Sequence, residues 1–191
     1  MDLILASTSP FRRELLSRLN LDFQCVAPHC DENTLPEEKP YETALRLAQC
    51  KAQSLHDSHA DALIIGSDQV AFANNRQYGK PLTIENAQKM LRELSGQKMC
   101  FYTALVVINS RNNKVYRHVD ETTVYLRKLS DEMICNYLQR EPDAVHCAGA
   151  AKSESLGMML IDKIESTDPN ALIGLPMFRL IDILYQEGFS V

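Results

Sequence analysis

The hydrophobic and polar positions of the chain follow strand-like and helix-like patterns from its first residues onward. Apolar residues fill positions 3–6, hydroxyl side chains occupy 7–9, and leucines then recur at helical spacing over 15–19. Ser9 suits the N-cap of this helix, and Pro10 suits its first position because proline lacks the N–H that would have no partner there. The opening therefore predicts a strand, a turn and a helix.

Helices continue to alternate with strands along the rest of the chain, and no segment repeats. The predicted elements are a strand at 21–26, a loop at 28–40, a helix at 40–55, a buried strand at 62–66, a hairpin turn at 73–78, a helix capped by Thr83, a long hairpin of 99–109 and 114–129, a helix capped by Ser130, a strand at 156–161 and a final amphipathic helix ending at Gly188. This order predicts an α/β or mixed α+β fold with a mixed sheet, as a single domain over 1–191.

Two arginines at the start of the first predicted helix point to an anion. Arg12 and Arg13 lie where the positive end of the helix dipole repels cations. Free backbone N–H groups, the Ser7 hydroxyl and two guanidinium groups together match what a polyphosphate needs. The alternative is that both arginines extend into solvent.

Two lysines are further candidates for phosphate binding. Lys51 borders the apolar face of the helix at 40–55, and Lys80 lies between Gly79 and Pro81 on a stiff loop. Each has an ordinary alternative: Lys51 as a lysine whose stem covers the edge of the core, and Lys80 as an exposed turn residue.

Two carboxylates complete the candidate chemistry. Asp68 follows the buried strand at 62–66, and ligands of open α/β sheets lie beyond the carboxyl ends of strands. Glu32 lies in an acid-rich loop, where acids are usually just solvated. Acids among bases suggest a divalent cation, Mg²⁺ or Mn²⁺, that bridges phosphates to Glu32 and Asp68. Asp68 would deprotonate or orient a water that attacks phosphorus.

Composition narrows the class of protein. A hydrophobic content of 45% and a charged content of 24% are typical of a globular chain. The net charge of −5 argues against broad binding of nucleic acid or anionic membranes. No apolar segment approaches the roughly 20 residues of a membrane span, and the short first apolar run does not resemble a signal peptide. The 6 cysteines show no CxxC pair, so we expect free thiols and a cytoplasmic protein.

Five segments in order resemble motifs of the Maf family of nucleoside triphosphate pyrophosphatases: LILASTSPFRRELL, IIGSDQV, YGKPLT, HCAGAAKSE and DPNALIGLP. Their combination over nearly the whole chain is specific, although each alone is weak. The resemblance implies an elongated mixed sheet flanked by helices, with two lobes around a cleft, as in the inosine triphosphate pyrophosphatases. It also implies a hydrolase that cleaves between the α and β phosphates, and a homodimer.

The SDQV motif resembles the Maf subgroup that acts on 7-methyl-GTP, since the dTTP- and UTP-directed subgroup typically has threonine after the aspartate. The resemblance implies that Asp68 is the catalytic base and that Phe11, Gln69 and Glu154 set substrate choice. Phe11 can stack on the cationic 7-methylguanine ring with roughly 0.5–2 kcal/mol of cation–π energy. Glu154 can accept hydrogen bonds from the guanine edge. Alternatively, Phe11 packs its helix against the sheet and Glu154 is a solvated loop acid.

Two other functions stay open at this point. One is a dTTP or UTP pyrophosphatase of the same family. The other is a nucleotide-binding regulator of cell division without turnover. An RNA-cap or tRNA binder has little support, because the net charge is negative and no stripe of aromatic and basic residues is present.

Overall fold

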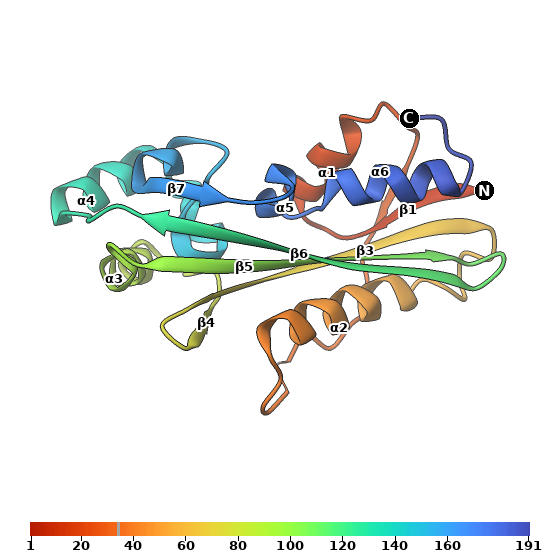
Figure 1. Cartoon of the computed structure of the whole chain (residues 1–191), viewed down its shortest axis with the longest axis horizontal. Helices are drawn as coiled ribbons and strands as arrows, with labels where there is room; N and C mark the ends of the chain where they lie inside the picture. The colour runs from red at the N-terminus through yellow and green to blue at the C-terminus, as the bar shows by residue number, and fades with distance from the viewer. Residues whose placement is uncertain (34) are drawn as a thin grey trace. The chain divides into compact units, whose positions relative to one another are not determined.

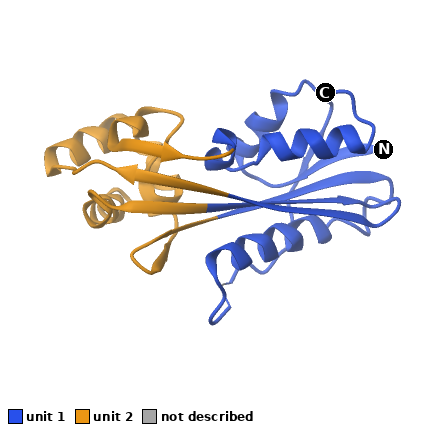
Figure 2. Ribbon diagram, viewed as in Figure 1, with its two compact units in different colours: residues 1–69, 102–120, 168–191 blue, residues 70–101, 121–167 orange. Residues whose placement is uncertain are grey.

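The structure is a computed structural model that describes residues 1–33 and 35–191; residue 34, in the loop predicted at 28–40, lies outside the described residues. The chain divides into two compact units, coloured separately in Figure 2. Unit 1 comprises Met1–Gln69, Tyr102–Asp120 and Asp168–Val191, and unit 2 comprises Val70–Phe101 and Glu121–Thr167. The single domain over 1–191 stays a prediction.

The described residues contain one mixed sheet of seven strands: β1 (Asp2–Ala6), β2 (Gln24–Val26), β3 (Ala62–Ala73), β4 (Arg76–Tyr78), β5 (Lys98–Asn109), β6 (Lys114–Leu126) and β7 (Ile161–Glu165). Their order is β2-β1-β3-β5-β6-β7, with β4 paired to β3. β1 is parallel to both of its neighbours, whereas the β3–β4 and β6–β7 pairs are antiparallel. The predicted mixed α/β class is confirmed.

Helices connect these strands within the described residues: α1 (Pro10–Ser17), α2 (Pro40–Gln53), α3 (Ile84–Leu94), α4 (Asp131–Arg140), α5 (Pro169–Ile173) and α6 (Met177–Gln186), with 3-10 segments η1 (Pro142–His146), η2 (Ala148–Ala150) and η3 (Leu156–Leu160). The predicted caps are confirmed. The hydroxyls of Ser9, Thr83 and Ser130 each accept a hydrogen bond from a backbone N–H in the first turn of their helix. Local capping chemistry was therefore enough to predict where these helices begin.

In unit 1, helices cover both faces of the sheet: α1 and α6 lie on one face and α2 on the other (Figure 1). Successive side chains of a strand point to opposite faces. Leu63 and Ile65 of β3 therefore join the core beneath α1 and α6. The next position, Gly66, faces α2 on the opposite side. The core beneath α1 and α6 consists of Leu3, Leu5, Leu15, Leu16, Leu63, Ile65, Leu105, Val107, Leu175, Met177, Leu180, Ile183 and Leu184.

The backbones of α2 and β3 come unusually close together at Gly66. A Cβ atom built on this glycine would overlap the carbonyl oxygen of Ala48 and lie 2.9 Å from the Ala52 Cβ. Ala44, Ala48 and Ala52 are fully buried on this side of α2. The glycine and the alanines leave room for direct backbone contact. This contact brings Lys51, which directly precedes Ala52 and is itself buried, close to the strand.

In unit 2, the core lies between α3, α4 and the 3-10 segments. Eight buried side chains form this cluster: Ala87, Leu91, Ile134, Tyr137, Leu138, Ala144, Ala150 and Leu160. The β3–β4 hairpin belongs to the same unit, and its turn residues Asn74 and Asn75 have φ of 48° and 59°. Asparagine tolerates this left-handed conformation, so the predicted hairpin turn at 73–78 is confirmed.

Four predicted strand boundaries are wrong, one of them that of the strand predicted at 114–129, which ends at Leu126 as β6. The strand predicted at 156–161 is a 3-10 segment, and β7 begins only at Ile161. The reason is a tight turn in which the N–H groups of Ser155 and Gly157 both donate to the Lys152 carbonyl oxygen, at 3.1 and 3.0 Å. The strand predicted at 21–26 shortens to β2, and the one predicted at 62–66 continues as β3, because its second half pairs with β4.

The prediction that all the cysteines are free is wrong for two of them. Cys30 and Cys50 form a disulfide, with their Cα atoms 5.8 Å apart. The loop before α2 folds back over that helix, and the N–H of His29 donates to the Ser54 hydroxyl at 3.2 Å. A spacing of 20 residues carries no signal for such a pair. The other four are free thiols: Cys25, Cys100, Cys135 and Cys147.

No helix in the described part of the chain has the length and apolar character needed to cross a membrane.

The close contact at Gly66 gives a first testable prediction. Gly66→Ala should lower the free energy of unfolding by about 1–3 kcal/mol, because the added methyl group overpacks the α2 interface. Urea unfolding measures this change. The control is Gly79→Ala, whose Cβ would meet nothing within 4 Å. Equal stability of the two variants would contradict the contact.

Candidate active site

The candidate site lies where β1 ends and β3 continues. The parallel register pairs Leu5 with Ile65 as its last residues, so β3 runs on past the end of β1. Asp68 lies inside β3, three residues beyond that point, which corrects the expectation that it lies past the end of its own strand. Ser7 follows β1 directly, is buried, and accepts a hydrogen bond from the Ser9 N–H at 3.1 Å. The site therefore lies beyond the carboxyl end of β1.

Strand alternation divides the polar residues of β3 between two partners. Asp68 points toward α2 and contacts Lys51. Its neighbours Ser67 and Gln69 point to the opposite face and donate to carbonyl oxygens of α5 and its C-cap. A single short stretch of strand therefore holds an acid on one side and two anchoring donors on the other.

Lys51 is the centre of the charged part of the site. Its Nζ lies 2.6 Å from Asp68 Oδ1 and 3.2 Å from Glu32 Oε1. The side chains of Lys51 and Asp68 are 8% and 12% exposed, whereas that of Glu32 is 60% exposed. Lys51 is therefore a buried, paired cation, and not a lysine whose stem merely covers the edge of the core.

The two carboxylates suit a hard divalent cation that also binds phosphate. Both reach one ammonium nitrogen, so both can face a single cation. The described residues contain no group of three or more His, Cys, Asp or Glu side chains that could hold a metal. One or two carboxylates completed by substrate phosphates are the usual ligands of Mg²⁺. The two carboxylates therefore fit a hard divalent cation whose remaining ligands are phosphate oxygens.

The two arginines of α1 differ in their surroundings. Arg12 is half-buried, and its Nε donates to the Gly174 carbonyl oxygen at 2.8 Å. Burial lowers the pKa of Arg12, and the negative charges of Asp68 and Glu32 oppose this shift. Arg13 is exposed. The alternative in which both arginines extend into solvent does not hold for Arg12.

The other predicted residues of unit 1 are Phe11 and Gln69. Phe11 is half-buried and directly precedes Arg12 on α1. The Gln69 Nε2 donates to Thr103 Oγ1 at 2.9 Å and to the carbonyl oxygens of Ala171 and Leu172 at 3.0 Å. Three acceptors around one nitrogen leave the Gln69 Oε1 as the side-chain atom that can meet a ligand.

Unit 2 carries the remaining predicted residues, Lys80 and Glu154, and both are exposed. Both lie near Cys147. The pKa of this thiol is raised to about 11, mainly by burial; the charge of Glu154 contributes to the rise, and that of Lys80 opposes it. The structure therefore brings Lys80 and Glu154 to one region of unit 2.

Glu141 is a residue of unit 2 that sequence reasoning missed. Its buried carboxylate accepts hydrogen bonds from the Lys152 Nζ at 3.2 Å, from the Ser155 hydroxyl and from the Leu156 N–H. These bonds, led by that from Ser155, lower the pKa of Glu141. An acid at the C-terminus of a helix is unfavourable for the dipole, and that was the only local signal. Glu141 thus holds the segment that presents Glu154.

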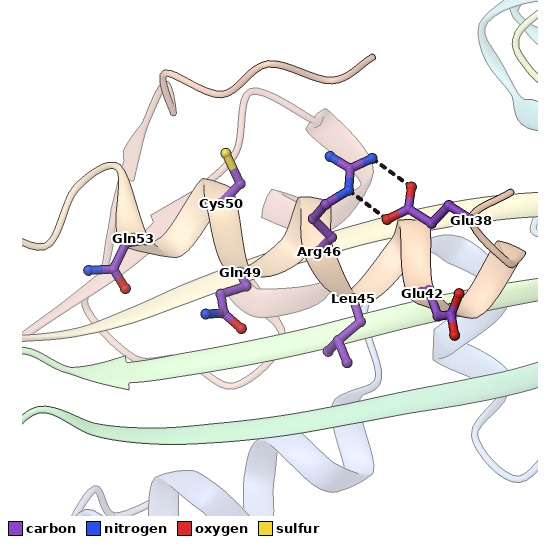
Figure 3. A pocket seen from close by; sticks show the side chains of 7 residues that line it. All are labelled: Glu38, Glu42, Leu45, Arg46, Gln49, Cys50 and Gln53. Carbon is purple, nitrogen blue, oxygen red and sulfur yellow. Dashed lines mark hydrogen bonds and ion pairs between the residues drawn. The ribbon is translucent and has the colours of Figure 1, made fainter. Parts of the chain in front are cut away.

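A second anchor lies on α2, beside the loop that carries Glu32. The Arg46 guanidinium donates to both oxygens of Glu38, at 2.6 and 2.8 Å (Figure 3). It also donates to the Asn33 carbonyl oxygen at 3.0 Å. The Thr43 hydroxyl adds a bond to Glu38 at 2.9 Å. This pairing with Arg46 lowers the pKa of Glu38 to about 2.

A surface hollow of about 540 Å³ lies on the same outward side of α2 (Figure 3). None of the predicted site residues lines it, because Lys51 is on the inward side of the helix. The hollow is therefore separate from the candidate site. Its lining residues are Glu38, Glu42, Leu45, Arg46, Gln49, Cys50 and Gln53.

Comparison with known proteins agrees with this fold and these motifs. Residues 2–187 match the family model described as Maf-like protein, and the chain therefore belongs to the Maf family. It is 52% identical over 191 residues to a 7-methyl-GTP pyrophosphatase of Neisseria meningitidis, covering 100% of this chain and 97% of the relative. It is 51% identical to the Chromobacterium violaceum protein of that name, over 100% and 99% of the chains, and 47% identical to that of Aliivibrio fischeri, over 99% and 97%.

The Glu38–Arg46 anchor gives a prediction for pH. Because the pKa of Glu38 is about 2 in the folded chain and near 4.5 otherwise, its contribution to stability is complete above pH 4.5. It should be lost as the pH falls from about 4.5 to about 2. Thermal unfolding between pH 2 and 7 measures this loss.

Glu38→Gln should melt at a lower temperature than wild type at pH 7, and the two melting temperatures should converge toward pH 2. The control is Glu37→Gln, an exposed neighbour. A constant difference between wild type and Glu38→Gln across the whole range would contradict the anchor.

Proposed function

We propose that this protein hydrolyses the bond between the α and β phosphates of 7-methyl-GTP, giving 7-methyl-GMP and pyrophosphate. The observation that carries the proposal is the buried ion pair of Lys51 with Asp68, in which Glu32 pairs with the same ammonium group. Arg12 lies close enough for the negative charges of both acids to raise its pKa against the effect of burial. The names of relatives that share about half of their residues with this chain support the choice of substrate.

The triphosphate binds through the basic residues. The Arg12 guanidinium keeps its terminal nitrogens for phosphate, since its Nε is bound to Gly174. Ser7, the N–H groups that open α1 and the exposed Arg13 add donors at the same helix end. Lys51 and, from unit 2, Lys80 supply further positive charge.

Hydrolysis uses one water and one proton acceptor. Asp68 orients the water through its carboxylate and takes one of its protons. The water oxygen forms a bond to the α phosphorus, and the bond from that phosphorus to the bridging oxygen breaks with its electron pair on pyrophosphate. Lys51 holds the carboxylate in place and stabilises the negative charge that develops on the phosphate oxygens.

Asp68 and Glu32 are the residues that would hold a divalent cation, Mg²⁺ or Mn²⁺. When bound, the cation supplies positive charge against the phosphate oxygens.

We assign recognition of the base to Phe11, Gln69 and Glu154. The Phe11 ring offers a face to the cationic 7-methylguanine. The Gln69 Oε1, which has no hydrogen-bond partner among the described residues, and the exposed Glu154 carboxylate offer acceptors to the N–H groups at the guanine edge. A cytoplasmic location and a homodimer are further parts of this proposal; light scattering of the purified protein tests the dimer.

Replacing the proposed base tests the mechanism. Asp68→Asn should lower kcat for 7-methyl-GTP by about 10²–10⁴-fold, because the amide cannot take the proton of water. The affinity for a non-hydrolysable triphosphate should change only a few-fold. Pyrophosphate release and calorimetry measure the two quantities. Asp22→Asn, an exposed acid of the same unit, is the control. Undiminished turnover by Asp68→Asn would remove Asp68 from this role.

A panel of triphosphates tests the substrate. With Mg²⁺ or Mn²⁺ present, kcat/KM should be highest for 7-methyl-GTP and lower for GTP, dTTP and UTP. Phe11→Ala and Glu154→Gln should reduce the preference for 7-methyl-GTP over GTP. A preference of wild type for dTTP or UTP would support the other branch of the family. Binding without turnover across the panel would support a regulator.

A further inference from the structure

In the described part of the chain, four side chains from three other elements hold the C-terminal end of α5. The last carbonyl groups of a helix have no partner within the helix and need donors from elsewhere. Those of Ala171 and Leu172, together with that of the C-cap Gly174, lie toward the candidate site. Their donors are Arg12 of α1, Ser67 and Gln69 of β3, and Thr103 of β5. All of these residues belong to unit 1.

Arg12 is one of these donors, and it also faces the phosphate site. Its Nε bond to the Gly174 carbonyl is 2.8 Å long, and the Ser67 hydroxyl donates to the same oxygen at 2.9 Å. The guanidinium is planar, so a fixed Nε–H direction fixes the direction of the whole group. Among the described residues, the Arg12 Nη1 and Nη2 have no hydrogen-bond partner. The position of Gly174 therefore determines where Arg12 presents its free donors.

Thr103 has no place in the mechanism, yet it is fully buried in an otherwise apolar stretch of β5. Burying a hydroxyl is unfavourable unless it is hydrogen-bonded. The Thr103 hydroxyl donates to the Ala171 carbonyl oxygen at 2.9 Å and accepts from the Gln69 Nε2 at 2.9 Å. Among the described residues, both of its bonds thus lead to α5, directly or through Gln69.

We propose that Thr103 is a positioning residue for Arg12. Thr103 and Gln69 hold the last turn of α5, this turn fixes the Gly174 carbonyl, and that carbonyl sets the direction of the Arg12 guanidinium toward the phosphates. Gly174 has a φ of 133°, a conformation that side chains rarely adopt, so the chain leaves α5 along a path that depends on this glycine. The choice of substrate in this proposal rests on the proposed function. The hydrogen bonds from which the proposal is argued are independent of that function.

Removing the Thr103 hydroxyl is the central test. Thr103→Val keeps the shape and should lower kcat/KM for 7-methyl-GTP by about 10- to 100-fold, because a misplaced contact group costs that much. Thr103→Ser keeps the hydroxyl and should stay within about twofold of wild type. Ser110→Ala is the matched control: it removes another buried hydroxyl of unit 1, one bonded to His59 and Ala62 and not to α5. It should leave kcat/KM unchanged.

A double-mutant cycle separates positioning from general loss of stability. In an Arg12→Ala background, Thr103→Val should cause no further loss of kcat/KM, because the group that it positions is gone. Equal losses in both backgrounds would overturn the proposal. The proposal would also be overturned if Arg12→Ala lowered the activity while Thr103→Val kept the activity of wild type.

A binding measurement keeps the result independent of the substrate. Inorganic tripolyphosphate should bind about tenfold more weakly to Thr103→Val than to wild type. In the Arg12→Ala background, adding Thr103→Val should leave the tripolyphosphate affinity unchanged. If wild type turns over no triphosphate, the proposed function fails. The tripolyphosphate affinities of the same variants still decide the role of Thr103 in that case. Equal tripolyphosphate affinity of wild type and Thr103→Val would overturn that role.

Discussion

The buried ion pair between Lys51 and Asp68 is the interaction on which the rest of the site depends. Removing two charges from water is costly, and the cost is recovered only when their geometry is good. That geometry comes from the backbone contact between α2 and β3, where Gly66 and Ala48 leave no space for a side chain. The charged pair of the site thus depends on a glycine and an alanine whose side chains carry no functional group. A larger side chain at either position would overpack the contact between α2 and β3 and so disturb the pairing of the acid with the lysine.

Much of the fold was predictable because its signals are local. Ser9 and Thr83 cap helices, and Asn74 adopts the backbone conformation of a hairpin turn, each through contacts within a few residues. The candidate residues of unit 1 were likewise predictable in kind, since Asp68 follows an apolar run and Arg12 lies in the first turn of a predicted helix. Their partners were not. Whether a lysine covers the edge of a core or pairs with an acid depends on which helix face meets the sheet, and helical periodicity leaves a border position undecided.

The residues that sequence reasoning missed share one property, which is that they act through contacts far apart in the chain. Glu141 meets a segment more than ten positions later, and Thr103 meets α5 across 68 positions. Neither residue type is unusual at its position, and neither belongs to a short motif. A buried threonine in an apolar strand has an ordinary explanation until its acceptor is known. Such residues become visible only when every buried polar atom is assigned a partner.

The disulfide between Cys30 and Cys50 has a consequence for the acid that lies two residues beyond it. A chain extends by at most about 3.6 Å per residue, so the Cα of Glu32 stays within about 7 Å of the Cα of Cys30. Cys50 adjoins Lys51 on α2, so this short tether keeps the backbone of Glu32 close to the helix turn that carries the ammonium. The cross-link therefore raises the effective concentration of one acid at the site. Glu32 is thus tied to the site by a covalent link, although its side chain is 60% exposed.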